Sequence, residues 1–238
     1  YIEKKNVVTI KELQALFPEV SLMTIHRDLD ALAEEGSVVK FRGGAKSVLH
    51  NGDPEFNVRI SENNSGKFAI AQKAMELLQP HSSVFLDAST TNLMLARSLP
   101  DMNLNIITTG PSIALELCRL HNPVVTLCCG TINRKNLALS GQNTLEMLDK
   151  INIDLAFIGV SGCSVEAGFT CGTEGDMLVK RLVIQKARTS VAMCTKEKLS
   201  CLMPYTFAKL QDVDYLISDV PMPDSFATAA REAGVKLL

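Results

Sequence analysis

The sequence Ser21-Leu22-Met23-Thr24-Ile25-His26-Arg27-Asp28-Leu29-Asp30-Ala31-Leu32 decides how the N-terminal part of the chain folds. Ser21 is a favourable N-cap, because its hydroxyl can accept a hydrogen bond from a backbone amide of the first helical turn. Apolar residues then recur at spacings of three and four, which predicts a helix whose buried stripe is Leu22, Ile25, Leu29 and Leu32. The opposite face carries Met23, Thr24, Arg27 and Ala31. Small and hydrogen-bonding residues near the start of an exposed face are typical of a helix that enters a DNA groove.

Another helix is expected just before this one. Thr9-Ile10-Lys11-Glu12 fits a capping box, in which the Thr hydroxyl and the Glu carboxylate each bond a backbone amide at a helix start. That helix would run to about Phe17 and stop before Pro18. Gly36 would end the helix that follows Ser21. The two helices therefore follow each other closely, as in a helix-turn-helix motif.

A hairpin is expected after the second helix. Residues 38–42 are strand-like, Gly43-Gly44 is a tight turn, and residues 46–49 could form the returning strand. Three cations of this wing could lie against a phosphate backbone, although each alone is typical of a solvated surface: Lys40, Arg42 and Lys46. Together the elements predict a winged helix-turn-helix domain over residues 1–50.

The charge of the chain contributes little to DNA binding. The formal net charge is −2, and residues 1–50 hold seven Lys/Arg against seven Asp/Glu. DNA binding would therefore depend on the placement of a few cations rather than on bulk charge. The balanced charge also leaves open a winged helix that binds a protein and makes no DNA contact.

The composition indicates a globular protein of the cytoplasm. A hydrophobic content of 46% and a mean hydropathy of +0.13 are ample for a sizeable core. No apolar run reaches the roughly 18 residues that span a bilayer, and no basic-then-apolar signal segment opens the chain. The seven cysteines show no C-x-x-C pair and no histidine at zinc spacing, which indicates reduced, mostly buried thiols. We therefore expect a cytoplasmic location, no membrane partner, no metal site and no cofactor.

A change of composition near residue 50 marks a domain boundary. Residues 50–64 lose apolar periodicity and gather Asn, Gly, Asp, Pro and Ser. We expect a linker over residues 51–66 and a second domain over residues 67–238. Because the sequence starts partway through what should be the first helix, we also expect about ten further residues upstream of Tyr1.

Helical and strand patterns alternate from residue 67 onward. Helices are expected at residues 67–78, 92–98, 112–120, 144–149, 175–187 and 225–233. Short apolar strands are expected at residues 84–86, 105–108, 124–128, 155–158, 190–193 and 215–217, with a terminal segment at 235–238. Such alternation predicts an α/β domain with a mostly parallel sheet covered on both faces.

The loops after these strands are rich in small and hydroxylated residues. In an open α/β sheet, ligands bind outside the carboxyl ends of the strands, where helix N-termini and Ser/Thr hydroxyls can hold a phosphate. Lys198 could add positive charge, as could Lys180, although such lysines are more often on the surface. The expected effector-binding residues are Asp87, Ser89, Thr90, Thr91, Thr109, Gly110, Gly130, Ser161, Gly162 and Lys198. The same residue types are also common in such loops because they favour turns.

Catalytic motifs are absent from the sequence. It has no G-x-S-x-G, no Walker loop, no G-x-G-x-x-G after a strand and no H-E-x-x-H. His81 and His121 lie near prolines, where a solvated or capping role is favoured over acid-base work. We expect no enzyme and no catalytic residue. The alternative is a sugar-phosphate isomerase-like enzyme with a winged-helix module, for which Asp87 is the one obvious acid in the candidate loops.

Residues 21–29 (SLMTIHRDL) and 40–45 (KFRGGA) resemble the winged-helix signature of the DeoR family, bacterial regulators that usually repress sugar and nucleoside operons. Downstream, residues 87–91, 108–110, 154–159 and 168–170 fall where the family's sensor domain has comparable loops. The resemblance covers nearly the whole chain. It implies a DNA-binding transcription repressor of a carbohydrate-utilisation operon, with double-stranded operator DNA and a phosphorylated sugar effector as its partners.

The resemblance also implies residue roles. Ser21, Thr24, His26 and Arg27 would contact DNA, together with Lys40 and Arg42 of the wing. Arg27 is the best candidate for a base edge or a phosphate. His26 stands where the family commonly has Arg and falls nearer the buried stripe, so we expect it to touch the backbone at most. A homo-oligomer is implied, because one winged helix reads only a half-site.

Three positions depart from the family pattern. Ser89 stands where the phosphate loop usually has Gly, which would narrow the approach of a ligand to the backbone. Ser161 and Thr195 each replace a commonly found Asp. The loss of two acids weighs against the isomerase alternative and indicates an effector unlike the commoner ones.

Overall fold

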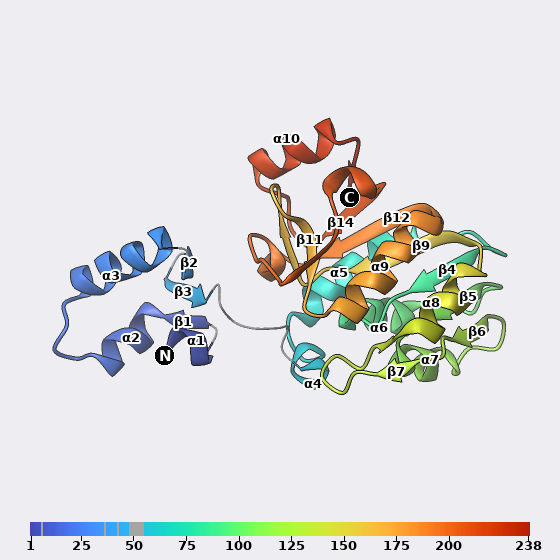
Figure 1. Cartoon of the computed structure of the whole chain (residues 1–238), viewed down its shortest axis with the longest axis horizontal. Coiled ribbons are helices and arrows are strands. Elements are labelled where there is room, and N and C mark those ends of the chain that lie inside the picture. The colour runs from blue at the N-terminus through green and yellow to red at the C-terminus, as the bar shows by residue number, and fades with distance from the viewer. Residues whose placement is uncertain (6, 36, 42, 48–54) are drawn as a thin grey trace. The chain divides into compact units, whose positions relative to one another are not determined.

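The structure is a computed structural model that describes residues 1–5, 7–35, 37–41, 43–47 and 55–238. The chain divides into two compact units, Tyr1–Asn51 and Gly52–Leu238 (Figure 1). The predictions for Gly36 as a helix end, for Arg42 as a DNA contact and for residues 51–54 as a linker lie outside the described residues.

The first unit is the predicted winged helix-turn-helix domain. Its elements are α1 (Ile2–Lys5), β1 (Val7–Thr9), α2 (Ile10–Leu16), α3 (Leu22–Glu34), β2 (Val38–Phe41) and β3 (Gly44–Ser47). The capping box is confirmed, because the Thr9 hydroxyl accepts from the Glu12 amide at 3.2 Å and the Glu12 carboxylate accepts from the Thr9 amide at 2.8 Å. Strand β1 was not predicted. It pairs with β3 in an antiparallel sheet of order β1-β3-β2, and no short-range sequence pattern signals such distant pairing.

The prediction for the buried stripe of α3 is wrong at its first residue. Ile25 and Leu29 are buried in the small core of this unit, and Leu32 packs against that core. Leu22, in contrast, is 44% exposed. It is the first residue of α3 and is not among the described residues that form this core or pack against it. Periodicity assigns a residue to a face but does not say how far the partner surface extends.

The second unit is built on a parallel sheet of seven described strands, in the order β15-β14-β12-β9-β4-β5-β6. The strands are β4 (Ser83–Leu86), β5 (Asn105–Thr108), β6 (Val124–Leu127), β9 (Ile153–Gly159), β12 (Ala187–Cys194), β14 (Tyr215–Ser218) and β15 (Lys236–Leu237). They match the strands expected from the sequence. The central strands β4 and β9 are mostly apolar and buried, because both faces of the sheet are covered there.

Helices cover both faces of the sheet (Figure 1). One face packs against α5 (Asn64–Met75), α6 (Thr90–Ser98) and α7 (Pro111–Leu117). The other packs against α8 (Gln142–Asp149), α9 (Glu174–Lys186) and α10 (Asp224–Glu232). Neighbouring strand residues alternate between the two cores, so that Val84 joins one and Phe85 the other. The predicted α/β fold with a doubly covered sheet is confirmed.

Two smaller sheets were not predicted. Strands β10 (Gly162–Ser164), β11 (Gly168–Cys171) and β13 (Tyr205–Ala208) form an antiparallel sheet, and β7 (Thr131–Ile132) pairs with β8 (Leu139–Ser140). Two short 3-10 helices complete the unit, η1 (Lys196–Lys198) and η2 (Leu210–Asp212). These strands have two to four residues, too few for a period-2 pattern to stand out.

Residues 55–66 differ from the linker that the sequence analysis expected. They contain α4 (Phe56–Arg59) and the start of α5, and they belong to the second unit. Phe56 is 4% exposed and joins the core that α5, α6 and α7 cover. Its amide donates to the Lys135 carbonyl at 2.8 Å. The polar composition of this stretch gave no indication that the Phe56 side chain is buried.

Candidate functional site

The start of helix α3 presents polar side chains and a long exposed face. The Ser21 hydroxyl accepts from the Thr24 amide at 3.2 Å and lies 2.9 Å from the Thr24 hydroxyl. Arg27 is exposed, and Met23 is 81% exposed. The face predicted to enter a groove is thus open to solvent, with the hydroxyl pair at the N-terminus of the helix and a cation one turn further along.

The wing lysine is turned toward the helix. Lys40 of β2 forms an ion pair with Asp30 of α3, and its ammonium donates to the His26 carbonyl at 3.5 Å. His26 is partly buried, as its place beside the buried stripe predicts. Lys40 therefore holds the wing against the helix in this structure, and its predicted DNA contact stays a prediction. The same holds for the other predicted DNA contacts.

The order of the large sheet reverses between β4 and β9. From β4 the chain moves outward through β5 to β6, and from β9 it moves the opposite way through β12 and β14 to β15. The loops after β4 and β9 therefore diverge at the carboxyl edge of the sheet, the carboxyl-terminal ends of its strands. This reversal is the topological switch point at which open α/β sheets bind ligands.

Asp87 joins the two sides of the switch point. It follows β4 and is 1% exposed. Its Oδ1 accepts from the Ser89 amide at 3.1 Å and from Asn92 Nδ2 at 2.7 Å. Its Oδ2 accepts from the Gly159 amide at 2.9 Å and lies 3.3 Å from Lys180 Nζ. The chain itself thus supplies three hydrogen-bond donors and one cation to this carboxylate, which fastens the loop after β4 to the end of β9.

Lys180 was expected to lie on the surface, but its side chain is only 4% exposed. Its ammonium pairs with Asp176 at 2.9 Å and donates to the Gly159 carbonyl at 2.8 Å. It also lies 5.2 Å from the centre of the Phe207 ring. Burial alone lowers the pKa of Lys180, whereas the carboxylates of Asp176 and Asp87 raise it by more, so the net pKa lies well above 10.5. Lys180 is therefore a fixed cation beneath the carboxyl edge.

Asn92 completes this network and was not predicted. It is fully buried in the first turn of α6, where Nδ2 donates to Asp87 and, at 2.8 Å, to the Phe157 carbonyl. Its Oδ1 has no hydrogen-bond partner among the described residues. A single asparagine after a run of hydroxylated residues gives no signal in one sequence.

The loops after β4, β5 and β9 lie together. Ser89 caps α6 by accepting from the Asn92 amide at 3.1 Å, and a Cβ added to Gly159 would overlap the Ser89 side chain. Gly110, which precedes α7, packs closely against Ala88, since an added Cβ would be 3.0 Å from the Ala88 Cα. Three further predicted effector residues of these loops are buried: Thr90, Thr91 and Thr109.

Ser161 lies in the loop after β9 and is 5% exposed, and three further predicted effector residues lie elsewhere: Gly130, Gly162 and Lys198. Gly130 follows β6, and an added Cβ there would overlap the Thr144 hydroxyl of α8. Gly162 lies inside the small sheet, where an added Cβ would overlap the Cys201 carbonyl. Lys198 is partly buried at the end of η1, just beyond β12. Effector contact by any of these residues stays a prediction.

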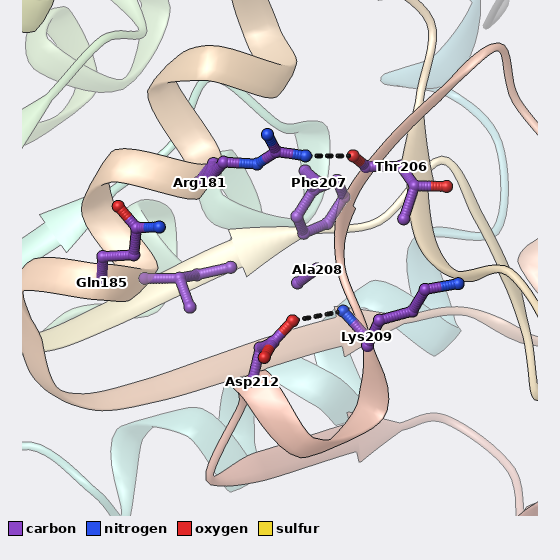
Figure 2. Close-up of a pocket in the computed structure, with 8 residues that line it drawn as sticks. Arg181, Gln185, Thr206, Phe207, Ala208, Lys209 and Asp212 are labelled. Carbon is purple, nitrogen blue, oxygen red and sulfur yellow. Dashed lines mark hydrogen bonds between the residues drawn. The ribbon is translucent and has the colours of Figure 1, made fainter.

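A separate hollow of about 510 Å³ opens beside α9 (Figure 2). Arg181 lies on its rim and donates to the Thr206 carbonyl at 3.2 Å, and the Lys209 amide donates to Asp212 at 2.7 Å. Phe207 lines the hollow and also lies over the ammonium of Lys180. The hollow is lined from α9, β13 and η2, and the predicted effector residues are not among its lining residues.

Each of the two units matches a known family description. Residues 1–50 match the DeoR-like helix-turn-helix domain, and residues 62–220 match the DeoR C-terminal sensor domain. The chain belongs to the DeoR family. It is thus a DeoR-family transcriptional regulator, whose helix-turn-helix domain is the first unit and whose sensor domain lies within the second.

Curated relatives resemble the chain along most of its length. The HTH-type transcriptional regulator GlpR of Haloferax volcanii is 33% identical over 92% of this chain and 86% of its own. The regulator GolR of Listeria innocua is 31% identical over 98% of this chain and 92% of its own. The transcriptional repressor GlcR of Bacillus subtilis is 30% identical over 100% of this chain and 92% of its own.

Proposed function

We propose that this DeoR-family regulator represses a carbohydrate-utilisation operon and that a phosphorylated sugar controls its affinity for operator DNA. The observation that carries the sensing role is the meeting of the loops after β4, β5 and β9 at the switch point. Two of these loops lead into the N-termini of α6 and α7. Such helix starts offer backbone amides and the positive end of the helix dipole to a phosphate. A relative named as a repressor, GlcR, supports repression rather than activation.

The surroundings of Asp87 favour sensing over catalysis. A general base needs a lone pair directed at a substrate proton. The Asp87 carboxylate instead accepts from two backbone amides and one carboxamide and pairs with a buried ammonium. We therefore propose that Asp87 holds the loops in place and that the protein is not an isomerase.

The remaining partners follow from the DNA-reading role. A repressor that reads a two-fold operator needs two copies of α3, so we propose a homo-oligomer. Within the part of the chain that the structure describes, no helix is long and apolar enough to cross a membrane. No described group of His, Cys, Asp and Glu is placed to hold a metal ion. We propose a cytoplasmic location, where operator DNA and sugar phosphates meet.

DNA reading is tested by replacing Arg27. A duplex selected by the wild-type protein from a randomised pool serves as the probe, and its affinity is measured by fluorescence anisotropy. Loss of a base or phosphate contact costs about 1–3 kcal/mol, so Arg27→Ala is expected to weaken binding by about 5- to 150-fold. The matched control is Arg231→Ala, which removes an exposed arginine of α10 in the sensor unit. Equal affinities of the two variants would contradict a reading role for α3.

Effector sensing is tested by thermal denaturation against sugar phosphates. Ribose 5-phosphate, glucose 6-phosphate and fructose 1-phosphate are each compared with their unphosphorylated sugars. A ligand at 100 times its Kd adds about 2.7 kcal/mol to the free energy of unfolding, which raises Tm by about 5–11 °C in a unit of this size. A shift with the phosphorylated sugar alone is the expected result. No shift with any of the three would contradict the proposal in this form.

A further inference from the structure

The first described segment of the second unit is bonded at both ends to loops of the carboxyl edge. We call residues 55–63 the connector segment. At one end, the Phe56 amide donates to the Lys135 carbonyl at 2.8 Å. At the other, Asn63 Nδ2 donates to Glu197 Oε2 at 2.9 Å and Oε1 at 3.1 Å, and to Asp219 Oδ2 at 3.0 Å. These partners are distant in sequence, so the contacts arise only in the folded unit.

All three partners follow strands of the large sheet. Lys135 lies between β7 and β8, in the loop after β6 that also holds Gly130. Glu197 lies in η1 directly after β12, and Asp219 follows β14. Because these strands are parallel, their carboxyl ends share one edge of the sheet, the edge at which ligands bind in such folds. The connector segment therefore touches loops from both halves of the edge where the effector is proposed to bind.

Asn63 is the most constrained residue of the segment. Its backbone is left-handed, with φ 42° and ψ 49°, a conformation that asparagine tolerates better than most side chains. Its Oδ1 caps α5 by accepting from the Gly66 amide at 3.0 Å, while its Nδ2 bonds two carboxylates. A Cβ added to Gly66 would overlap the Asp219 carboxylate, so the cluster has no spare volume. Both polar atoms of the Asn63 carboxamide are therefore hydrogen-bonded.

A buried lysine ties the rest of the segment to α5. Lys67 is 6% exposed, and its ammonium donates to the Arg59 carbonyl and, at 2.6 Å, to the Glu62 carbonyl. These carbonyls lie at and beyond the end of α4. The segment is thus held as one piece, with the polar cluster around Asn63 as its attachment to the loop that carries Lys198.

We propose that Asn63 is the positioning residue through which effector occupancy reaches the DNA-reading unit. The inference rests on the proposed function, because that function places the effector at the carboxyl edge. A ligand that moves η1 by contacting Lys198 must also move Glu197, the preceding residue, and so change its bonds to Asn63. Among the described residues of the second unit, the connector segment is nearest in sequence to the first unit. A ligand that favours one state of these bonds is therefore coupled to the affinity of the first unit for DNA.

The test measures binding of the effector separately from the effect of that binding on DNA affinity. Asn63→Asp keeps the oxygen that caps α5 but sets a third carboxylate against Glu197 and Asp219. Glu197→Ala removes the other side of the same bond at an exposed position and leaves the cap intact. Glu76→Ala, an exposed acid at the end of α5, is the matched control. In the full chain, thermal denaturation reports binding of the three sugar phosphates. The ratio of DNA dissociation constants with and without the sugar phosphate that binds reports coupling.

In the wild type and the control we expect this ratio to be about 5 to 150, the usual range for linked sites. In Asn63→Asp and Glu197→Ala it is expected to approach 1 while the sugar phosphate still shifts Tm. A ratio unchanged in both variants would overturn the relay and leave the proposed function standing. A wild type that binds none of the three sugar phosphates would overturn both. The two failures are therefore told apart by the wild-type measurement.

Discussion

Replacing Lys180 by methionine is expected to lower the free energy of unfolding of the sensor unit by about 3–5 kcal/mol, the usual cost of breaking a buried ion pair. The Lys180 side chain is 4% exposed and pairs with Asp176 at 2.9 Å and Asp87 at 3.3 Å. Methionine fills much of the space of the lysine stem, so the loss comes mainly from two carboxylates left without their cation. Asp87 keeps three other donors, which places the expected cost toward the lower end of the range.

The measurement is thermal and urea denaturation followed by circular dichroism. At about 2–4 °C per kcal/mol for a unit of this size, Tm should fall by about 6–20 °C. Lys186→Met is the matched control on the same helix, because Lys186 donates to the Asp149 carbonyl at 2.6 Å and pairs at 3.5 Å with an Asp149 side chain that is 72% exposed. Such a pair contributes about 0–1 kcal/mol. A Lys180→Met chain as stable as Lys186→Met would refute the conclusion that the buried network stabilises the switch point.

The pH dependence gives a second check on Lys180. Its pKa is raised in the folded state, so its stabilisation is fully present below the unfolded value of 10.5 and is lost as pH rises through the higher folded value. The stability difference between the wild type and Lys180→Met should therefore stay constant from pH 7 to about pH 10 and shrink above that. A difference that already falls between pH 7 and pH 9 would contradict this assignment.

Three further predictions concern single sites. Gly159→Ala should cost about 1–3 kcal/mol in urea denaturation, because the new methyl group overlaps Ser89, and adding Ser89→Gly should recover most of it; an undiminished stability of Gly159→Ala would contradict the close contact. Burial lowers the pKa of Lys67 to about 8, so its charge destabilises the fold below pH 8 and this penalty is relieved as pH rises toward 10.5. Lys67→Met should therefore flatten the rise in Tm between those pH values, and parallel curves for the two chains would count against it. Thr9→Ala should lose the capping box with Glu12 and cost about 1 kcal/mol, seen as faster amide exchange over residues 10–16, whereas Thr9→Ser should exchange like the wild type.

Signals carried by a few neighbouring residues could be predicted from the sequence. The capping box of Thr9 and Glu12 and the Ser21 N-cap are each complete within four residues, and the structure contains both. The alternation of helices and strands after residue 67 likewise predicted the doubly covered parallel sheet. The predictions that failed concern residues whose burial depends on surfaces formed by other parts of the chain. Leu22 is exposed because the core ends short of it, and Phe56 is buried because a core formed by later residues receives it.

The role of Asp87 shows the limit for the site. The sequence indicated the carboxyl edge of the sheet as the candidate site and placed the Asp87 carboxylate on it. It could not indicate that this carboxylate accepts from the Gly159 amide and pairs with the Lys180 ammonium, both far along the chain. Nor could it indicate Asn63, whose partners Glu197 and Asp219 meet it only when β12 and β14 are in place. Single-sequence patterns report the positions of loops, whereas side-chain roles depend on what the fold brings to them.

The three residues that depart from the family pattern differ in burial, and this difference determines how we expect each to affect effector binding. Ser161 and Thr195, which stand where acids are common, are 5% and 6% exposed, whereas Ser89 is partly exposed at the start of α6. A buried acid needs its own cation or donors. Lys180, the buried cation beside this edge, already neutralises Asp87 and Asp176. Neutral hydroxyls at the two buried positions therefore avoid further negative charge beneath a site proposed for a phosphate. Ser89 is then the departure that we propose to meet the ligand, and its side chain occupies space beside Gly159 that a glycine would leave open.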